Sequence, residues 1–193
     1  MKVLIIYAHP REKSFNQAIL KRAESVLAEL RQEVKIRDLY ALGFNPSLSA
    51  DDQNQLDQGI IPPDIKAEQD FISWAEYIIV IHPIWWIGMP AIMKGYIDRV
   101  MVSGFAYVFE ENQMKELLDD KKVLLINTTG TPELMMEKKG ITKVLQASID
   151  KGIYEFCGME VEHLFLAGVP YVKSADREDY LDQVENILWK EFN

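Results

Sequence analysis

The sequence is poor in residues on which several kinds of protein depend. It has one cysteine, Cys157, so no disulfide can form within the chain, and 193 residues can bury enough apolar surface without one. Its three histidines do not stand beside cysteines or acidic residues at the spacing of a metal site. We therefore expect a protein of the reducing cytoplasm that holds no metal ion.

Positive charge is also scarce. The 21 Lys and Arg residues are outnumbered by 30 Asp and Glu residues, which gives a formal net charge of −9. Nucleic acids and anionic membranes bind proteins through an excess of basic side chains, so this balance argues against both as partners. The most apolar stretch, residues 77–93, is broken by His82 and two prolines and is shorter than the roughly 20 residues that cross a bilayer. No membrane insertion is expected.

What the chain does contain is an alternation of short apolar runs with amphipathic segments. The apolar runs predict strands buried on both faces of a parallel sheet, at residues 3–8, 34–39, 77–81, 123–127 and 161–167. Helices are expected between them, at residues 14–30, 63–74, 90–101, 141–156 and 176–189. Residues 40–61 lack periodicity and are expected to form a long loop. With no repeat or linker, the pattern predicts a single α/β domain spanning residues 1–193.

The segment after the first strand has the features of an anion site. In such sheets ligands bind beyond the carboxyl ends of the strands. Here His9, Ser14 and Asn16 surround the beginning of a helix, whose free N–H groups and dipole favour a phosphate. A capped helix beside an exposed histidine explains the same residues equally well. Neither a P-loop nor a Gly-x-Gly-x-x-Gly motif is present.

Two tryptophans follow the third strand. Trp85 and Trp86 lie between Pro83 and Pro90 in a strand-to-helix turn, where adjacent side chains cannot both point into one core. A flat apolar ligand would explain them. The alternative is that one of them covers a hydrophobic edge or a subunit contact.

The fourth strand is followed by Thr128, Thr129 and Gly130, which could face the polar edge of a ring system, although such residues occur in any turn. Upstream of that strand, Phe105, Tyr107 and Phe109 alternate and suit either the roof of a flat pocket or core packing. Two other residues are expected to have structural roles: Cys157 is predicted to be buried at a helix end, and His163 to lie in the fifth strand.

These motifs acquire a specific meaning when they are taken together. In order along nearly the whole chain they resemble the NAD(P)H:quinone oxidoreductase family, which includes DT-diaphorase, the modulator of drug activity B proteins and the ancillary flavoproteins of glutathione-gated potassium efflux systems. The resemblance implies a three-layer, flavodoxin-like, doubly wound sheet of five parallel strands in the order 2-1-3-4-5. The segments that carry it are residues 8–16, 82–95, 98–100, 104–107 and 128–130.

The resemblance also implies a cofactor and the residues that hold it. One flavin per chain, FMN or FAD, is expected at the three strand ends. Its phosphate would be held by His9, Ser14, Phe15 and Asn16. Its ring would be lined by Pro83, Ile84, Trp85, Trp86 and Ile87, with Thr128, Thr129 and Gly130 on the pyrimidine side. Trp86, Tyr107 and Phe109 are expected to be the catalytic residues, and Phe105, Tyr107 and Phe109 would form an aromatic substrate wall completed across a homodimer.

The implied reaction is a two-electron, ping-pong transfer, in which NAD(P)H gives a hydride to the flavin and a quinone or similar electrophile then takes the electrons. One departure concerns a Tyr and a His that assist charge relay in the quinone reductases. The matching stretch here has Met135, Met136, Lys138, Lys139 and Thr142. The alternative function is a flavin-binding regulatory subunit that docks on a potassium efflux transporter.

Overall fold

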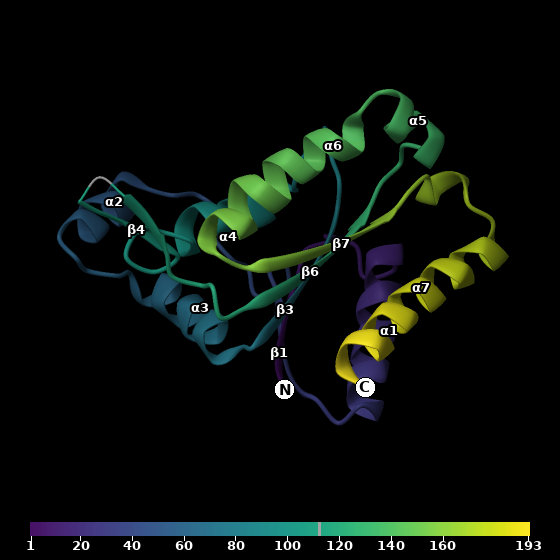
Figure 1. Ribbon diagram of the computed structural model, residues 1–193, viewed down its shortest axis with the longest axis horizontal. Helices are drawn as coiled ribbons and strands as arrows, with labels where there is room; N and C mark the ends of the chain where they lie inside the picture. The colour runs from purple at the N-terminus through teal and green to yellow at the C-terminus, as the bar shows by residue number, and fades with distance from the viewer. Residues whose placement is uncertain (112) are drawn as a thin grey trace.

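A computed structural model of the protein describes residues 1–111 and 113–193, except for the side chains of 174–176. Its centre is a five-stranded parallel sheet in the order β2-β1-β3-β6-β7 (Figure 1). Those strands are β1 (Lys2–Tyr7), β2 (Glu33–Asp38), β3 (Tyr77–Pro83), β6 (Lys122–Thr128) and β7 (Glu160–Leu166). The flavodoxin-like order predicted from the sequence is confirmed, because β6 and β7 are the fourth and fifth strands of this sheet.

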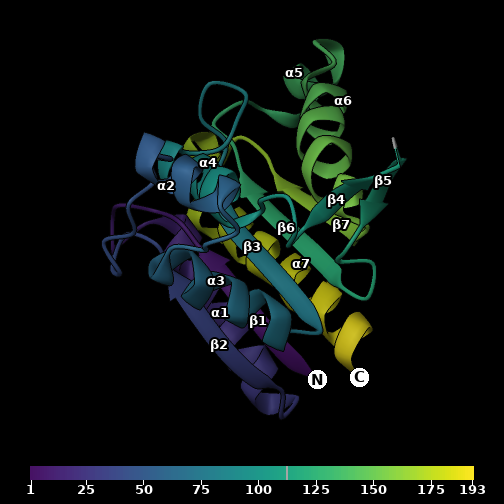
Figure 2. The ribbon, with the colours of Figure 1, turned by 90° about the vertical axis from the view of Figure 1, so that its left-hand side faces the viewer.

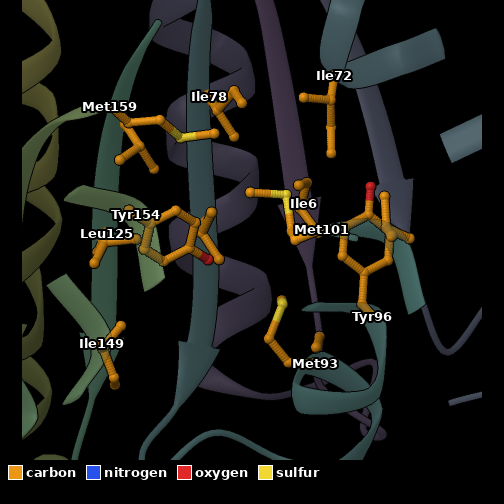
Figure 3. Packing of buried hydrophobic residues seen from close by; sticks show 14 of the residues in the cluster. Ile6, Ile72, Ile78, Met93, Tyr96, Met101, Leu125, Ile149, Tyr154 and Met159 are labelled. Atoms are coloured by element: carbon orange, nitrogen blue, oxygen red, sulfur yellow. The ribbon is translucent and has the colours of Figure 1, made fainter. Parts of the chain in front are cut away.

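Helices cover both faces of the sheet (Figure 2). One face packs against α1 (Phe15–Glu29) and α7 (Ser174–Phe192), with Ile5, Ile79 and Leu124 in the shared core. The opposite face packs against α3 (Pro63–Trp74), α4 (Ala91–Val100) and the helical segments that follow β6. Ile78 and Leu125 lie in this second core, shown in Figure 3. Apolar burial on both faces explains why these strands are continuous apolar runs.

The prediction of a loop throughout residues 40–61 was wrong. Residues Ala50–Asp57 form the helix α2, which begins with a capping box in which Ser49 Oγ accepts from the N–H of Asp52 and Asp52 Oδ2 accepts from the N–H of Ser49. The helix is too polar to show a periodic apolar face. An ion pair supplies its anchor: buried Arg99 of α4 donates Nε and one terminal nitrogen to Asp52, both over 3.1 Å.

Arg99 also contacts two neighbouring segments. It donates to Asp64 Oδ2 of α3 over 2.6 Å and to the carbonyl oxygen of Asn45 over 3.1 Å, so one guanidinium joins three parts of the chain. The pKa of Asp52 is lowered from its usual 3.8, chiefly because Asp52 accepts hydrogen bonds from Arg99. Close packing reinforces the junction, because a Cβ at Gly95 would lie 2.1 Å from the carbonyl oxygen of Pro46.

Two regions contain elements that the sequence patterns do not predict. The strands β4 (Tyr107–Glu110) and β5 (Gln113–Glu116) pair antiparallel outside the main sheet, and α5 (Glu133–Lys138) follows β6. The helix expected at 141–156 is confirmed but has three forms, α6 (Ile141–Leu145), a π-helix (Gln146–Tyr154) and a 3₁₀ turn (Glu155–Cys157). Another 3₁₀ turn, Val169–Tyr171, follows β7.

Cys157 ends the helical stretch as predicted. It is 3% exposed, and burial raises the pKa of its thiol to about 11, so it is protonated and unreactive at neutral pH. Among the residues that the structure describes, no helix is both long and apolar enough to cross a membrane.

Candidate active site

A cavity of about 730 Å³ lies at the carboxyl ends of β1, β3 and β6. The structure places around it every residue predicted to bind a cofactor: His9, Ser14, Phe15, Asn16, Pro83, Ile84, Trp85, Trp86, Ile87, Thr128, Thr129 and Gly130. Adjacent parallel strands end at one edge of a sheet, which is why three segments so distant in the sequence meet here.

The β1 side of the cavity suits an anion. Ser14 is the N-cap of α1 and its hydroxyl accepts from the N–H of Gln17 over 3.1 Å, so the first turn of the helix opens on the cavity. The first N–H groups of any α-helix lack partners within it. Arg11 and Lys13 add positive charge at the rim. Dipole, donors and cations therefore all favour negative charge at this end of the cavity.

His9 supplies a polar ring beside this end. Its Nδ1 lies 3.0 Å from the backbone nitrogen of Arg11 and 3.3 Å from the carbonyl oxygen of the same residue, so it accepts from the N–H in one tautomer and donates to the carbonyl oxygen in the other. Partial burial lowers the pKa of His9 below 6.5, so the ring is uncharged at neutral pH.

Asn16 has a polar atom that nothing in the described part of the chain satisfies. The side chain is 3% exposed, and its Nδ2 donates to Thr128 Oγ1 over 2.8 Å, which joins α1 to the end of β6. Its Oδ1 is buried and accepts no hydrogen bond from any described residue. Because an unpaired buried polar atom costs about 1–3 kcal/mol, a ligand that donates to Oδ1 would be favoured here.

The turn after β3 is strained. Trp85 and Gly88 exchange two backbone hydrogen bonds, of 3.0 and 3.1 Å, around Trp86 and Ile87. Both central residues have positive φ, 52° and 54°, where an L-residue costs about 1–2 kcal/mol. Trp86 is fully exposed at 101%, so no packing within the chain offsets that cost. Such strain persists most often where function needs it.

The β6 side is held by its own hydroxyls. Thr129 Oγ1 accepts from the N–H of Thr131 over 2.8 Å, and the Thr129 N–H donates to the carbonyl oxygen of Leu166 on β7. Both Thr128 and Thr129 are buried, so this wall of the cavity is polar and held by hydrogen bonds.

Comparisons with known proteins show the fold and the family of the chain. A family model described as having the flavodoxin-like fold matches residues 1–188. An uncharacterized NAD(P)H oxidoreductase of Haemophilus influenzae is 41% identical over 161 residues, which cover 83% of this chain and 80% of that protein. NAD(P)H dehydrogenase (quinone) 1 of Cavia porcellus is 33% identical over 215 residues, covering 98% of this chain and 78% of that protein.

This protein belongs to the NAD(P)H:quinone oxidoreductase family. It has the flavodoxin-like fold and is an oxidoreductase, as the sequence motifs indicate. A more distant solved structure, an FMN-dependent NADH-azoreductase of Bacillus anthracis in complex with FMN, superposes with a TM-score of 0.77 over 100% of this chain and 99% of that one. At 19% identity that likeness shows the shared fold.

Several residues that line the cavity were not predicted to belong to the site. They are Met136, Ile141, Leu145, Val169, Pro170 and Arg177. Val169 and Pro170 follow β7 directly, so the rule that ligands bind beyond strand ends, applied to the fifth strand, would have found them. Arg177 has no such signal, since one arginine near the start of an amphipathic helix looks like any solvated cation.

The three residues predicted to be catalytic do not all meet in this chain. Trp86 lines the cavity, whereas Tyr107 and Phe109 lie outside it on β4, where Phe109 is 65% exposed. Tyr107 instead lines a separate groove with Asp98 and Phe156. Among the described residues no group of His, Cys, Asp and Glu could hold a metal ion.

Proposed function

We propose that this oxidoreductase binds one flavin per chain in the 730 Å³ cavity and uses it to pass two electrons from NAD(P)H to a quinone or related electrophile. The observation that carries the proposal is the convergence of a helix N-terminus with neighbouring cations, an exposed indole and two buried threonines on one cavity. When bound, the flavin supplies the hydride chemistry, and the chain supplies binding and orientation.

The residues present fit a flavin. The orphaned Oδ1 of Asn16 needs a donor, and the hydroxyls of a ribityl chain are donors. The N-terminus of α1, with Arg11 and Lys13, would hold the phosphate. Trp85 and Trp86 would flank the ring, and the wall formed by Thr128–Gly130 would meet its pyrimidine edge. FMN and FAD both fit this proposal, because Arg177 adds a further cation to the lining of the cavity, besides Arg11 and Lys13.

A second copy of the chain would complete the acceptor pocket. Tyr107 and Phe109 contribute nothing to the cavity of their own chain, yet their rings pack together at 5.9 Å on an exposed hairpin. We propose that they form the substrate wall of the partner's site in a homodimer.

The Tyr and His that assist charge relay in the quinone reductases are absent here, and their absence affects proton transfer to the acceptor more than hydride transfer. Met136 lines the cavity and Met135 is exposed, and a thioether cannot donate or accept a proton at neutral pH. We therefore propose that protons reach the acceptor from water. The regulatory alternative is not favoured, because the relatives are named as enzymes.

Anaerobic titration of the purified chain tests the function. After incubation with FMN or FAD and desalting, we expect a visible flavin spectrum that bleaches on addition of NADH or NADPH and returns on addition of a quinone. Absence of bound flavin would reject the proposal. Bleaching without recovery by any quinone would reject the acceptor class.

The strained turn makes a further prediction at Trp86. Trp86→Gly and Trp86→Ala should both weaken flavin binding, by about tenfold, because each removes an aromatic contact. The free energy of unfolding of the glycine variant should be about 1 kcal/mol higher than that of the alanine variant, since only glycine relieves the positive φ. Urea unfolding and FMN titration measure the two effects. Equal stability of the two variants would show that the turn is not strained.

A further inference from the structure

A row of buried side chains, which we call the hydrogen-bond chain, runs from the π-helix through β7 and β6 to β3. Asp150 Oδ1 lies 2.7 Å from His163 Nδ1, and His163 Nε2 lies 2.8 Å from Asn127 Oδ1. Asn127 Nδ2 then lies 3.2 Å from His82 Nε2, and His82 Nδ1 lies 2.9 Å from the carbonyl oxygen of Pro83. His82 and Asn127 are 0% exposed, so solvent does not interrupt the chain.

The backbone fixes the direction of these hydrogen bonds. Asn127 Nδ2 is also 3.2 Å from the carbonyl oxygen of His82, which accepts its hydrogen. The reversed amide would set two oxygens against each other at this point. Asn127 Oδ1 therefore faces His163, and Nε2 of His163 must carry the hydrogen that it accepts.

At the other end of the amide, His82 is left with one possible tautomer. Its Nε2 accepts from Asn127, and burial lowers the pKa of the ring to about 4, so at neutral pH the single hydrogen is on Nδ1. That hydrogen is donated to the Pro83 carbonyl oxygen. The N–H of Ile84, in the same peptide group, donates to the carbonyl oxygen of Thr128 over 2.7 Å. The Pro83–Ile84 peptide is thus held from both sides.

Asp150 closes the chain at its outer end. It lies within the π-helix, and its carboxylate meets His163 Nδ1 with side-chain exposures of 9% and 3%. Whether the shared proton sits on Nδ1 or on the carboxyl group, Nε2 keeps its hydrogen, so the direction of the chain is unchanged. Phe165 stacks on the His163 ring at 3.7 Å and restricts its rotation.

We propose that Asp150, His163, Asn127 and His82 are positioning residues, which fix His82 as the Nδ1–H tautomer and thereby hold the Pro83–Ile84 peptide in the shape that binds the flavin. The effect on flavin rests on the function proposed above, whereas the tautomer does not. None of the four side chains lines the cavity, but Pro83, Ile84 and Thr128 do. The hydrogen-bond chain therefore acts on the ligand through the backbone of Pro83 and Ile84.

A matched pair of variants at His82 separates this role from simple packing. The amide nitrogen of asparagine occupies nearly the place of Nδ1, and that of glutamine the place of Nε2. His82→Asn keeps a donor for Pro83 and should bind FMN within about threefold of the wild type. His82→Gln loses that donor and should bind about tenfold more weakly, as expected for one lost hydrogen bond. Thermal unfolding of both variants reports any general loss of packing. Equal FMN affinity of the two would overturn the proposal.

Nitrogen NMR of the ligand-free wild-type chain tests the tautomer without any flavin. The chain has only three histidines, so their ring signals can be assigned by single substitutions. We expect His82 with hydrogen on Nδ1 alone and His163 with hydrogen on Nε2. A hydrogen on Nε2 of His82 would overturn the proposal even if the variants failed to fold. A wild type that showed these tautomers but bound no flavin would instead refute the proposed function and leave the hydrogen-bond chain intact.

Discussion

Replacing Arg99 with methionine is expected to lower the free energy of unfolding by about 3–5 kcal/mol. The side chain is 3% exposed and bonds to two carboxylates and a carbonyl oxygen from three segments. Methionine matches its apolar stem but leaves Asp52 as a buried charge without its partner. Urea denaturation of the two proteins at pH 7 measures the difference.

A control on the same helix isolates the effect of burial. Lys94→Met also removes one positive charge from α4 and one ion pair, with Asp98, but both of those side chains are exposed. The expected change there is below about 1 kcal/mol. Similar losses of unfolding free energy in the two variants would mean that the ion pairs of Arg99 stabilise the fold no more than a surface ion pair does.

Acid provides a second measurement of the same cluster. Because Arg99 lowers the pKa of folded Asp52, this interaction stabilises the fold above pH 3.8 and is lost as the pH falls through the lowered value. The difference in the free energy of unfolding between the wild type and Arg99→Met should therefore become smaller as the pH falls below 3.8. A gap that stays constant down to complete protonation would contradict the assignment to Asp52.

Replacing Asn16 with leucine is expected to weaken FMN binding by about 10- to 100-fold. Leucine keeps the branched shape but removes both the orphaned Oδ1 and the bond from Nδ2 to Thr128, and each buried polar interaction is worth about 1–3 kcal/mol. The fold should lose less than about 1 kcal/mol, because an unsatisfied oxygen is removed at the same time. Titration of the flavin-free protein with FMN gives the affinity.

Gln17→Leu is the matched control for that variant. Gln17 is the next residue of α1 and also carries an amide, but it does not line the cavity. FMN affinity should stay within about threefold of the wild type. If both variants lost affinity equally, the cause would be the helix rather than the carbonyl group of Asn16.

Much of the fold and the composition of the cavity could be predicted because both follow from local patterns. Five apolar runs indicate five buried strands, and the rule that ligands bind beyond strand ends selects the segments at His9, Pro83 and Thr128. The resemblance then orders the sheet. Their binding roles remain predictions, but the structure does bring these segments together.

The remaining features depend on contacts between distant residues, which leave no periodic trace. α2 is polar and is held by Arg99, 47 residues away. Arg177 reaches the cavity only because α7 packs beside α1. His163 was assigned a structural place in its strand, and its partners, Asp150 on a helix and Asn127 on the neighbouring strand, are visible only once the sheet register is known.

The π-helix has a consequence for anyone who modifies this protein. Its buried positions, Ile149, Asp150 and Tyr154, follow the buried Leu145 by four, five and nine residues. A helical wheel drawn with 3.6 residues per turn would place Tyr154 on the face opposite Leu145, although both side chains are buried. Labels, tags or surface charges should be placed at positions that are exposed in the structure, such as Ala147 and Lys151. Deleting a single residue between Leu145 and Asp150 would shift the register and turn the carboxylate away from His163.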